Sequence, residues 1–480
     1  MSASVVRPAY PDVLASRYAS LDMLHIWSPE GRIVLERELW ITVMRAQAAL
    51  GLNIPDAALE AYERVKHQVN LDSIMQRERS LRHDVKARIE EFCALAGHEH
   101  IHKGMTSRDL TDNVEQLQVK RSLELLRDKT VAALAGLSAL ALRHQHTLLV
   151  ARTHHVPAQP TTLGKRLAMF GQEILHALER LEATLGAYPL RGLKGAVGTR
   201  LDQTTLFNGD GQMAEKLEQA LANRLGFGRV LDNVGQVYPR SLDFEVVSVM
   251  VQVGAGLSDF AKSMRLMTGH ELVSEGFKQG QVGSSAMPHK MNARNCERIN
   301  GFQVLLAGYL EMLGRLAGDQ WNEGDVSCSV VRRVALPSAM FALDGALETF
   351  LTVLAEMEVF EAALAAEMRR QLPFLASTTL LMEALKRGAG REAAHQVIKT
   401  HSVAVARDLR NGLLAENDLA ARLGADAAFP LSQAEIEAVL GDTGQFVGAA
   451  AQQVERFASQ VAALTTRHPQ AAAYKPQPLI

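Results

Sequence analysis

Residues 246–267, with the sequence VVSVMVQVGAGLSDFAKSMRLM, form the longest and most regular hydrophobic repeat of the chain. Their large apolar side chains step by four and three residues, through Val246, Met250, Val253, Leu257, Phe260, Met264 and Met267. A sustained step of this kind is a 3.5-residue repeat, which places the apolar side chains on one face of a helix that winds around its neighbours. The stretch therefore predicts a long helix in a bundle.

Four further segments carry the same repeat, two before residues 246–267 and two after. They run through Val119, Leu123, Leu126, Thr130, Ala133, Leu137 and Leu140; through Leu163, Leu167, Phe170 and Ile174; through Ile299, Phe302, Leu306, Tyr309, Leu313 and Leu316; and through Met340, Leu343, Leu347, Phe350, Leu354 and Met357. Five such segments predict an all-α fold with a central long five-helix bundle. At 1.5 Å per residue, these helices would be roughly 30–45 Å long.

Prolines indicate where some of these helices begin and where the flanking regions are interrupted. Pro160, Pro239 and Pro337 are each followed within two residues by Ser or Thr, which is typical of helix starts. No segment shows a clear strand alternation. The flanks carry shorter helical patterns, broken at Pro373 and Pro430 near the C-terminus. We expect three helical domains, at residues 1–106, 107–360 and 361–480.

The composition excludes several classes of protein. Lys and Arg number 51 against 53 Asp and Glu, so a nucleic-acid binder with a basic excess is not expected. No apolar run approaches the roughly 18 residues of a membrane span, and residues 1–10 do not resemble a signal peptide. Cys93, Cys296 and Cys328 are far apart and odd in number. We therefore expect a cytoplasmic protein without a disulfide framework.

The stretch Glu275–Asn292, with the sequence EGFKQGQVGSSAMPHKMN, interrupts the helical pattern with three glycines. A loop of this length inside a compact domain is usually functional or disordered. Glycine-rich flanks would let the loop close over a ligand and bring its serines, histidine and lysine to it. A flexible inter-helix loop with solvated side chains is the alternative that composition leaves open.

Three other polar stretches are candidates for a site. His154 and His155 lie just before an expected helix start and carry side chains that transfer protons near neutral pH. Arg82-His83-Asp84 would hold a phosphate and a base edge if it lines a cleft, and Arg17 would hold a phosphate bidentately. Taken alone, each of these stretches is more often a turn or a solvated connector.

His98, His100 and His102 alternate along the chain and invite a metal interpretation. The cluster lacks a cysteine or carboxylate partner at a recognised ligand spacing, because Glu99 points to the other face of a helix. We therefore predict no metal site and no cofactor.

The loop resembles the signature of the fumarase/aspartase superfamily, Gly-Ser-Ser-x-Met-Pro-x-Lys-x-Asn, which here spans residues 283–292. Within that superfamily, further stretches are similar to the adenylosuccinate lyase family. They are Ser16-Arg17-Tyr18, Arg82-His83-Asp84, Met105-Thr106-Ser107, Thr153-His154 with the following Pro-Ala-Gln-Pro-Thr-Thr, and Gly235-Gln236. The resemblance runs from about Val13 to about Phe457.

This resemblance implies a three-domain helical subunit, four copies of which pool their bundles into one tetrameric core. Each active site would then be built from stretches of three chains. The implied reaction removes fumarate from adenylosuccinate to give AMP, and from the succinylated ribotide SAICAR to give AICAR. The substrate is thus a small nucleotide, with no nucleic acid or membrane as partner.

The resemblance also assigns roles to residues. Ser284 would be the general base and His154 the general acid, with backbone N–H groups, a helix N-terminus and Lys290 favouring the serine alkoxide. Lys290 and Asn292 would hold the fumarate-side carboxylates, assisted by Thr106, Ser107, Thr153 and Gln236. The AMP-side contacts would be Arg17, Tyr18, Arg82, His83, Asp84, Arg298, Ser329 and Arg333. Assistance to proton transfer is an alternative role for His83.

The chain departs from the family pattern at three positions. Ala293 stands where proline is usual, Val156 where many members have glutamine, and Gly324 where many have arginine. The last change removes a cation near the nucleotide, which we expect Arg298, Arg332 or Arg333 to replace.

Two kinds of rival function remain at this point. Argininosuccinate lyase, fumarase, aspartase and a cycloisomerase of aromatic degradation share the signature, but their substrates carry no phosphate. The Ser16-Arg17-Tyr18 and Arg82-His83-Asp84 stretches favour the nucleotide enzyme. A non-catalytic helical protein on the same scaffold is the other rival, and the presence of Ser284 and His154 argues against it.

Overall fold

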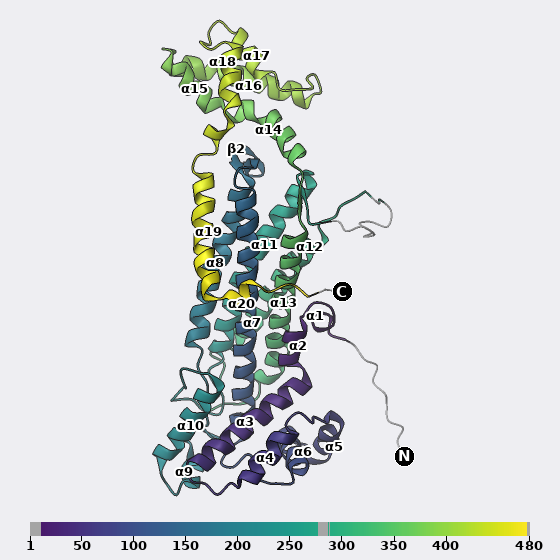
Figure 1. The fold of residues 1–480 in the computed structure, drawn as a ribbon, viewed down its shortest axis with the longest axis vertical. Helices are drawn as coiled ribbons and strands as arrows, with labels where there is room; N and C mark the ends of the chain where they lie inside the picture. The colour runs from purple at the N-terminus through teal and green to yellow at the C-terminus, as the bar shows by residue number, and fades with distance from the viewer. Residues whose placement is uncertain (1–10, 277–286, 288, 478–480) are drawn as a thin grey trace.

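The computed structural model describes residues 11–276, 287 and 289–477, which form an elongated assembly of helices (Figure 1). Its long axis is the axis of the central bundle. The five bundle helices are α7 (Ser107–Arg143), α8 (Leu163–Ala187), α11 (Ser241–Gly269), α12 (Arg294–Leu316) and α13 (Cys328–Glu356). Each of the five hydrophobic repeats lies on one of these helices, so the predicted bundle is confirmed.

The repeat at residues 246–267 faces the centre of the bundle as predicted. All seven of its apolar side chains are buried, and α11 packs along α8, α12 and α13. Phe260 lies at the centre, with its ring in edge-to-face contact with Phe170 at 5.9 Å and Phe350 at 4.9 Å. Such contacts stabilise a core beyond the area that they bury. The expected lengths were too short for α7, whose 37 residues span about 55 Å.

Two of the helices, α11 and α13, are long and apolar enough to cross a membrane by composition. Within the protein, 61% of the α11 window and 89% of the α13 window are buried. Their apolar character is therefore explained by the bundle core, which they share with the other long helices.

The expected helix start at Pro337 is wrong, because α13 begins at Cys328 and Pro337 lies inside it. Tertiary contacts of the turns before Pro337 outweigh the preference of a Pro-Ser pair for the start of a helix. Buried Arg332 ion-pairs there with Glu115 of α7 and Asp243 of α11, which holds the first turns of α13 against both helices.

The chain also contains strands that the sequence did not reveal. β1 (Leu148–Thr153) and β2 (Val156–Thr162) form an antiparallel hairpin, and β3 (Val273–Ser274) pairs with β4 (Glu358–Val359). Two prolines in β2 and an irregularity in β1 between Ala151 and Arg152 hide the alternation. His154 and His155 therefore lie in a hairpin turn rather than just before a helix.

The N-terminal flank and the segment between α8 and α11 cover one end of the bundle. The flank consists of α1 (Val13–Arg17), α2 (Leu21–Trp27), α3 (Pro29–Ala49), α4 (Asp56–Val65), α5 (Leu71–Leu81) and α6 (Asp84–Ala96). The other segment carries α9 (Leu201–Leu206) and α10 (Gly211–Leu225), and α10 packs on α3. We call the end where α7, α11 and α13 begin the network end, and the opposite end, with the β1–β2 hairpin, the hairpin end.

The C-terminal flank leaves the bundle and returns to it (Figure 1). Its helices are α14 (Glu361–Leu375), α15 (Ser377–Lys386), α16 (Arg391–Arg410), α17 (Leu419–Ala425), α18 (Gln433–Gly441), the 3₁₀ turn η1 (Thr443–Phe446), α19 (Ala450–Arg467) and α20 (Pro469–Ala472). Residues 376–436 contain a separate small core. By contrast, Val454, Phe457 and Val461 of α19 belong to the core of the bundle. The expected domain boundaries stay a proposal, with residues from about 450 onward sharing the bundle's core.

Candidate active site

The hairpin end presents the predicted acid on an exposed turn. His154 and His155 adopt left-handed backbone conformations, with φ of 52° and 61°, and both side chains are exposed. Two consecutive left-handed residues make the tight turn that matches the twist of a hairpin. Arg152 of β1 ion-pairs with Glu367 of α14, which ties the hairpin to the C-terminal flank. The turn is thus held at its base, while Thr153 and His154 face solvent.

The base of the signature loop is anchored on both sides. β3 leads into the loop and is paired with β4, which directly follows α13. The Glu275 carboxylate accepts hydrogen bonds from the Asn295 and Cys296 amides, at 2.9 and 3.0 Å. These amides belong to the first turn of α12, so the carboxylate joins the start of the loop to the helix that follows it.

The first turn of α12 bears on how the serine would be activated. Two of its amides, those of Asn295 and Cys296, already bind Glu275, and the expectation that a helix N-terminus favours the Ser284 alkoxide stays a prediction. Lys290 remains as the expected electrostatic partner. Ser284 itself lies outside the described residues, so its role stays a prediction.

Lys290 and Asn292 line a cavity of about 1020 Å³ at the exit of the loop. The lining carries Lys262, Arg265 and Lys290 against Glu271 and Glu297. Its lysines and arginine are groups that a carboxylate ligand would pair with. The cavity also adjoins the hairpin, because its walls include residues 269 and 271 and the His155 ring lies 5.6 Å from that of His270.

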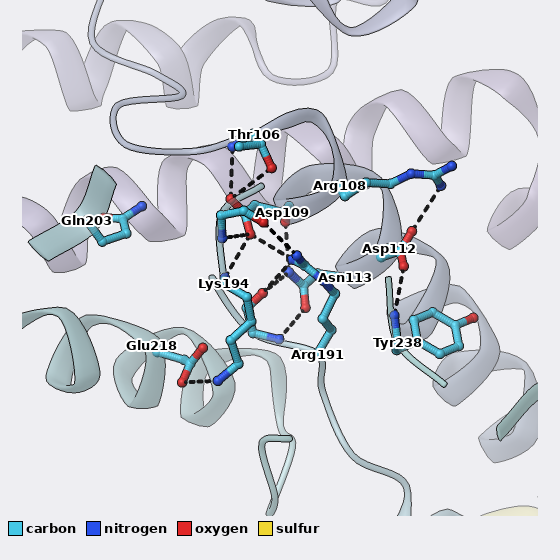
Figure 2. Close-up of polar contacts among 12 residues, drawn as sticks. Thr106, Arg108, Asp109, Asp112, Asn113, Arg191, Lys194, Gln203, Glu218 and Tyr238 are labelled. Atoms are coloured by element: carbon cyan, nitrogen blue, oxygen red, sulfur yellow. Dashed lines mark hydrogen bonds and ion pairs between the residues drawn. The ribbon is translucent and has the colours of Figure 1, made fainter. Parts of the chain in front are cut away.

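The network end holds Thr106 and Ser107 at the start of α7. The Thr106 amide and hydroxyl both donate to Asp109 Oδ2, at 2.8 and 3.3 Å, as part of a capping box. The other oxygen of the same carboxylate accepts from Arg191 Nη1 at 2.7 Å and from the Lys194 amide at 2.9 Å (Figure 2). Asp109 therefore fixes the start of α7 against the segment that follows α8.

Two more α7 residues extend this attachment along one helix face. Asn113 exchanges hydrogen bonds with the Gly192 backbone, and Gln116 does so with Pro189 and Arg191. Asp109, Asn113 and Gln116 are four and three residues apart and share one side of the helix. All three side chains are fully buried, and this polar face of α7 holds the backbone of residues 189–195 by hydrogen bonds.

A second carboxylate of α7 holds the segment that contains Gln236. Asp112 accepts from Arg108 at 3.1 Å, from Arg240 at 3.2 Å and from the Tyr238 amide at 3.2 Å. The backbone N–H of Gln236 in turn donates to the Glu323 carbonyl at 2.6 Å. The position of Gln236 is thus fixed through its backbone and that of Tyr238.

The departure at Gly324 has a backbone cause. Its φ is +135°, a conformation that side chains other than glycine rarely adopt. A Cβ atom here would lie 3.1 Å from Val237 Cγ2 and 3.3 Å from Gln236 Cβ. An arginine would therefore strain the loop in its present shape.

Arg332 does not replace the missing cation, contrary to one of our expectations. It is buried, and it pairs with Asp243 at 2.6 Å and with Glu115 at 2.6 Å while also contacting the Tyr238 hydroxyl. The next residue, Arg333, is exposed, and Ser329 is half-buried one turn earlier. Arg333 and Arg298 remain as the predicted cations.

The Arg82-His83-Asp84 stretch forms the turn between α5 and α6. Arg82 is left-handed, with φ of 55°, and its side chain is exposed. His83 caps α6 by accepting the Lys86 amide at 3.2 Å, and Asp84 pairs with Arg88 at 3.0 Å. The histidine and the aspartate thus have local structural partners, while Arg82 faces solvent.

Arg17, Tyr18 and Arg298 meet on the side of the bundle. The Arg298 guanidinium lies 5.1 Å from the centre of the Tyr18 ring, which also packs edge-on against Phe302 at 5.2 Å. The side chain of Arg17 is exposed at the end of α1. One chain therefore distributes those predicted site residues that the structure describes over the network end, the hairpin end and this side surface, and does not bring them together.

His102 illustrates how the histidine cluster is used. Its Nδ1 accepts the Trp40 indole N–H at 3.0 Å, and His100 contacts Lys103 at 2.9 Å. Burial lowers the pKa of His102 to about 4, against the opposing attraction of Asp109. Within the described residues, no group of three or more potential ligands gathers as a metal site.

The residues that sequence reasoning missed are buried ionic ones at the network end, Asp109, Asp112 and Arg191, while Arg332 was named for a different role. One signal was available, because Asp109, Asn113 and Gln116 place polar side chains at core spacing near the start of a predicted bundle helix. Their partners lie far away in sequence and carry no comparable pattern.

Comparison with known proteins connects both flanks and the bundle to one family. A family model described as lyase matches residues 26–308, and another, described as adenylosuccinate lyase C-terminus, matches residues 373–457. The chain is 33% identical to adenylosuccinate lyase of Schistosoma mansoni, over 93% of this chain and 94% of that protein. It is also 33% identical to the Schizosaccharomyces pombe protein of that name, over 94% of each chain.

Solved structures share the fold at lower identity. The 3-carboxy-cis,cis-muconate lactonizing enzyme from Pseudomonas putida superposes with a TM-score of 0.81 at 23% identity, over 95% of this chain and all of that chain. A fumarate lyase from Mesorhizobium superposes with a TM-score of 0.77 at 21% identity, over 94% of this chain and all of that chain. At these identities the likeness establishes the fold alone.

Proposed function

Because the chain belongs to the adenylosuccinate lyase family of the fumarase/aspartase superfamily, we propose that it eliminates fumarate from adenylosuccinate to give AMP. We propose the same cleavage for SAICAR, which gives AICAR. The observation that carries this proposal is the similarity to adenylosuccinate lyases over 93% of the chain, together with the retained signature loop. The cavity at the exit of that loop offers Lys290 and Asn292 to the dicarboxylate part of the substrate.

The elimination breaks one C–H and one C–N bond. Ser284 removes a proton from Cβ, the carbon adjacent to the one that carries the departing nitrogen, and the C–H electron pair forms the new C=C bond of fumarate. The C–N pair leaves with the nitrogen, which takes a proton from His154. Lys290 lies six residues from Ser284 in the same loop and stabilises negative charge on the alkoxide and on the carboxylate-delocalised carbanion.

The proposed binding groups divide into two sets. Lys290, Asn292, Thr106, Ser107, Thr153 and Gln236 contact the fumarate side. Arg17, Tyr18, Arg82, His83, Asp84, Arg298, Ser329 and Arg333 contact the AMP side. The hydrogen bonds around Thr106 and Gln236 support the first set, because they fix the backbone that carries these residues before the substrate arrives.

These sets meet only if chains associate, so we propose a homotetramer in which each site takes residues from three chains. Exposed apolar side chains on the bundle support this proposal. Val330 and Val334 lie one turn apart on α13 and are 75% and 50% exposed, and Val304 of α12 is 73% exposed. Apolar surface on long bundle helices is typical of an interface between subunits.

We further propose a cytoplasmic location. Cys93, Cys296 and Cys328 are all free thiols, and two of them are buried. A reducing compartment suits a protein with unpaired cysteines.

The activity is tested by mixing the purified protein with adenylosuccinate and following the absorbance change as AMP forms. We expect turnover at catalytic enzyme concentration, and none with argininosuccinate. Turnover of argininosuccinate without any change on adenylosuccinate would contradict the proposed substrate.

The proton-transfer role is tested by Ser284→Ala, with Ser285→Ala as the matched control in the same loop. We expect Ser284→Ala to bind adenylosuccinate and to lose roughly 10²–10⁴-fold in kcat, the usual contribution of a general base. Retention of the wild-type kcat by Ser284→Ala would refute the mechanism.

A further inference from the structure

We infer that the C-terminal segment Tyr474–Gln477, which we call the tail, positions Arg17 and Tyr18 for the nucleotide. It does so through a buried ion cluster in the middle of the bundle, formed by Lys129 of α7 with Asp344 and Glu348 of α13. The inference rests on the proposed function, because Arg17 and Tyr18 are proposed contacts of AMP. It assigns a positioning role to residues that have no part in the chemistry.

The cluster is short of positive charge. The Lys129 ammonium contacts both carboxylates, with Glu348 Oε1 at 2.6 Å, and all three side chains are fully buried. One ammonium group thus faces two carboxyl groups in a fully buried cluster. A buried carboxylate in excess is costly unless hydrogen-bond donors compensate its charge.

The compensating donors come from the two ends of the chain. The Ser20 amide donates to Asp344 Oδ2 at 2.6 Å, and Lys129 Nζ donates to the Ser20 hydroxyl at 2.9 Å. The Tyr474 hydroxyl and the Gln477 amide both donate to Glu348, the amide at 2.6 Å. The burial of the cluster and its bond to Glu348 raise the pKa of Tyr474, so its hydroxyl stays a donor.

The tail also contacts the N-terminal segment directly. The Leu21 amide donates to Gln477 Oε1 at 3.0 Å, and Gln477 Nε2 donates to Asp22 at 3.4 Å. The tail accordingly lies beside α1 and α2 (Figure 1). Ser20 and Leu21 are therefore held from the bundle side by Asp344 and from the other side by Gln477.

Tyr18 packs against Gly345, the residue next to Asp344. A Cβ atom on Gly345 would lie 2.9 Å from Tyr18 Cβ and 3.1 Å from the Tyr18 carbonyl oxygen. The segment thus lies flat on α13 with no room for a side chain beneath it. Because Tyr18 precedes Ser20 by two residues, a shift of Ser20 moves Tyr18 against Arg298 and Phe302.

The first test is Tyr474→Phe, which keeps the ring over Lys129 and removes only the donor to Glu348. We expect the Kd for AMP, measured by calorimetry, to rise about tenfold, the size of one lost hydrogen bond to a charged group. KM for adenylosuccinate rises in parallel, while kcat and inhibition by fumarate stay within about twofold of wild type. Lys475→Ala, at an exposed tail position, is the matched control and keeps wild-type AMP binding.

A second variant reaches the same segment from the opposite side. Gly345→Ala inserts a methyl group under Tyr18 without touching the tail, and we expect the same selective loss of AMP binding. In both variants, hydrogen exchange of the Ser20 and Leu21 amides becomes faster, which reports the loosened segment independently of activity.

The outcomes separate this inference from the proposed function. If the wild-type protein binds no AMP, the proposed function fails. If it binds AMP and Tyr474→Phe and Gly345→Ala bind it equally well, the positioning role is refuted, whether or not exchange of Ser20 and Leu21 accelerates.

Discussion

The two ends of the central bundle support their site residues in opposite ways. At the network end, Thr106 and Gln236 are held by buried, mutually paired ions such as Asp109 with Arg191. At the hairpin end, His154 and Lys290 are exposed, and only the bases of the hairpin and the loop are anchored. One end is a fixed frame and the other presents reactive groups to solvent.

The difference predicts what each end would contribute to the proposed reaction. A binding group benefits from a frame that cannot relax, because orientation is then obtained before the substrate arrives. A proton donor must reach the substrate and exchange protons with solvent between turnovers. Substitutions at the network end should therefore reduce stability, and substitutions at the hairpin end should reduce turnover.

The largest effect is expected at the hairpin end, for His154→Asn. Asparagine tolerates the left-handed backbone of the turn but does not transfer protons near pH 7. We predict a loss of roughly 10²–10⁴-fold in kcat with an unchanged melting temperature, measured by steady-state kinetics and calorimetry.

The neighbouring His155→Asn serves as the control, since it has the same exposure and nearly the same φ. It should keep most of the activity. Equal losses for both variants would show that the turn, and not the His154 side chain, is what matters.

The next effect is expected at the network end, for Asp109→Asn. The variant keeps the shape of the side chain but leaves the buried Arg191 without its anion. Breaking one partner of a buried pair costs about 3–5 kcal/mol of unfolding free energy. Denaturant titration measures the loss.

The matched control is Glu311→Gln, which breaks an exposed pair with Arg315 on α12. Its stability should equal that of the wild type within error. A stable Asp109→Asn protein would contradict the description of this end as a fixed frame.

The smallest effect is a pH dependence at the network end that arises from His102. Its pKa is about 4 when folded and about 6.5 when unfolded, so between these values only the unfolded state binds the proton. The contribution of His102 to stability should therefore fall as pH decreases from 6.5 to 4, by at most about 3 kcal/mol, and this contribution should stay constant below pH 4.

His102→Asn isolates this contribution. Asparagine fits the left-handed backbone, with φ of 63°, and offers an oxygen to the Trp40 indole N–H, but it does not titrate. The facing charged groups, Asp109, His83 and Lys86, are unchanged. Between pH 6.5 and 4, the unfolding free energy of His102→Asn should depend on pH with a smaller slope than that of the wild type. Equal slopes would exclude His102 as the source of the pH dependence.

Much of the fold was predictable because helices repeat over short distances. The five hydrophobic repeats placed α7, α8, α11, α12 and α13, and the signature residues 283–292 identified a site loop. The hairpin was missed because its prolines mask the alternation, and the Pro337 start was wrong because buried Arg332 extends α13.

The supports of the site were not predictable, because their partners are distant in sequence. Asp109 pairs with Arg191, 82 residues away, and Lys129 with Asp344, 215 residues away. Taken alone, each of these side chains resembles an ordinary solvated charge on a helix. The local sequence does not show that the side chain will be buried and will therefore need a partner.

Residue order alone therefore established the long helices, their buried faces and the presence of the signature loop, since all three are local properties of the chain. Tertiary structure alone established which ions pair, why Gly324 is glycine, and that the tail meets Ser20 and Leu21 on the bundle. The physical reason is that burial and charge compensation depend on which segments the fold brings together.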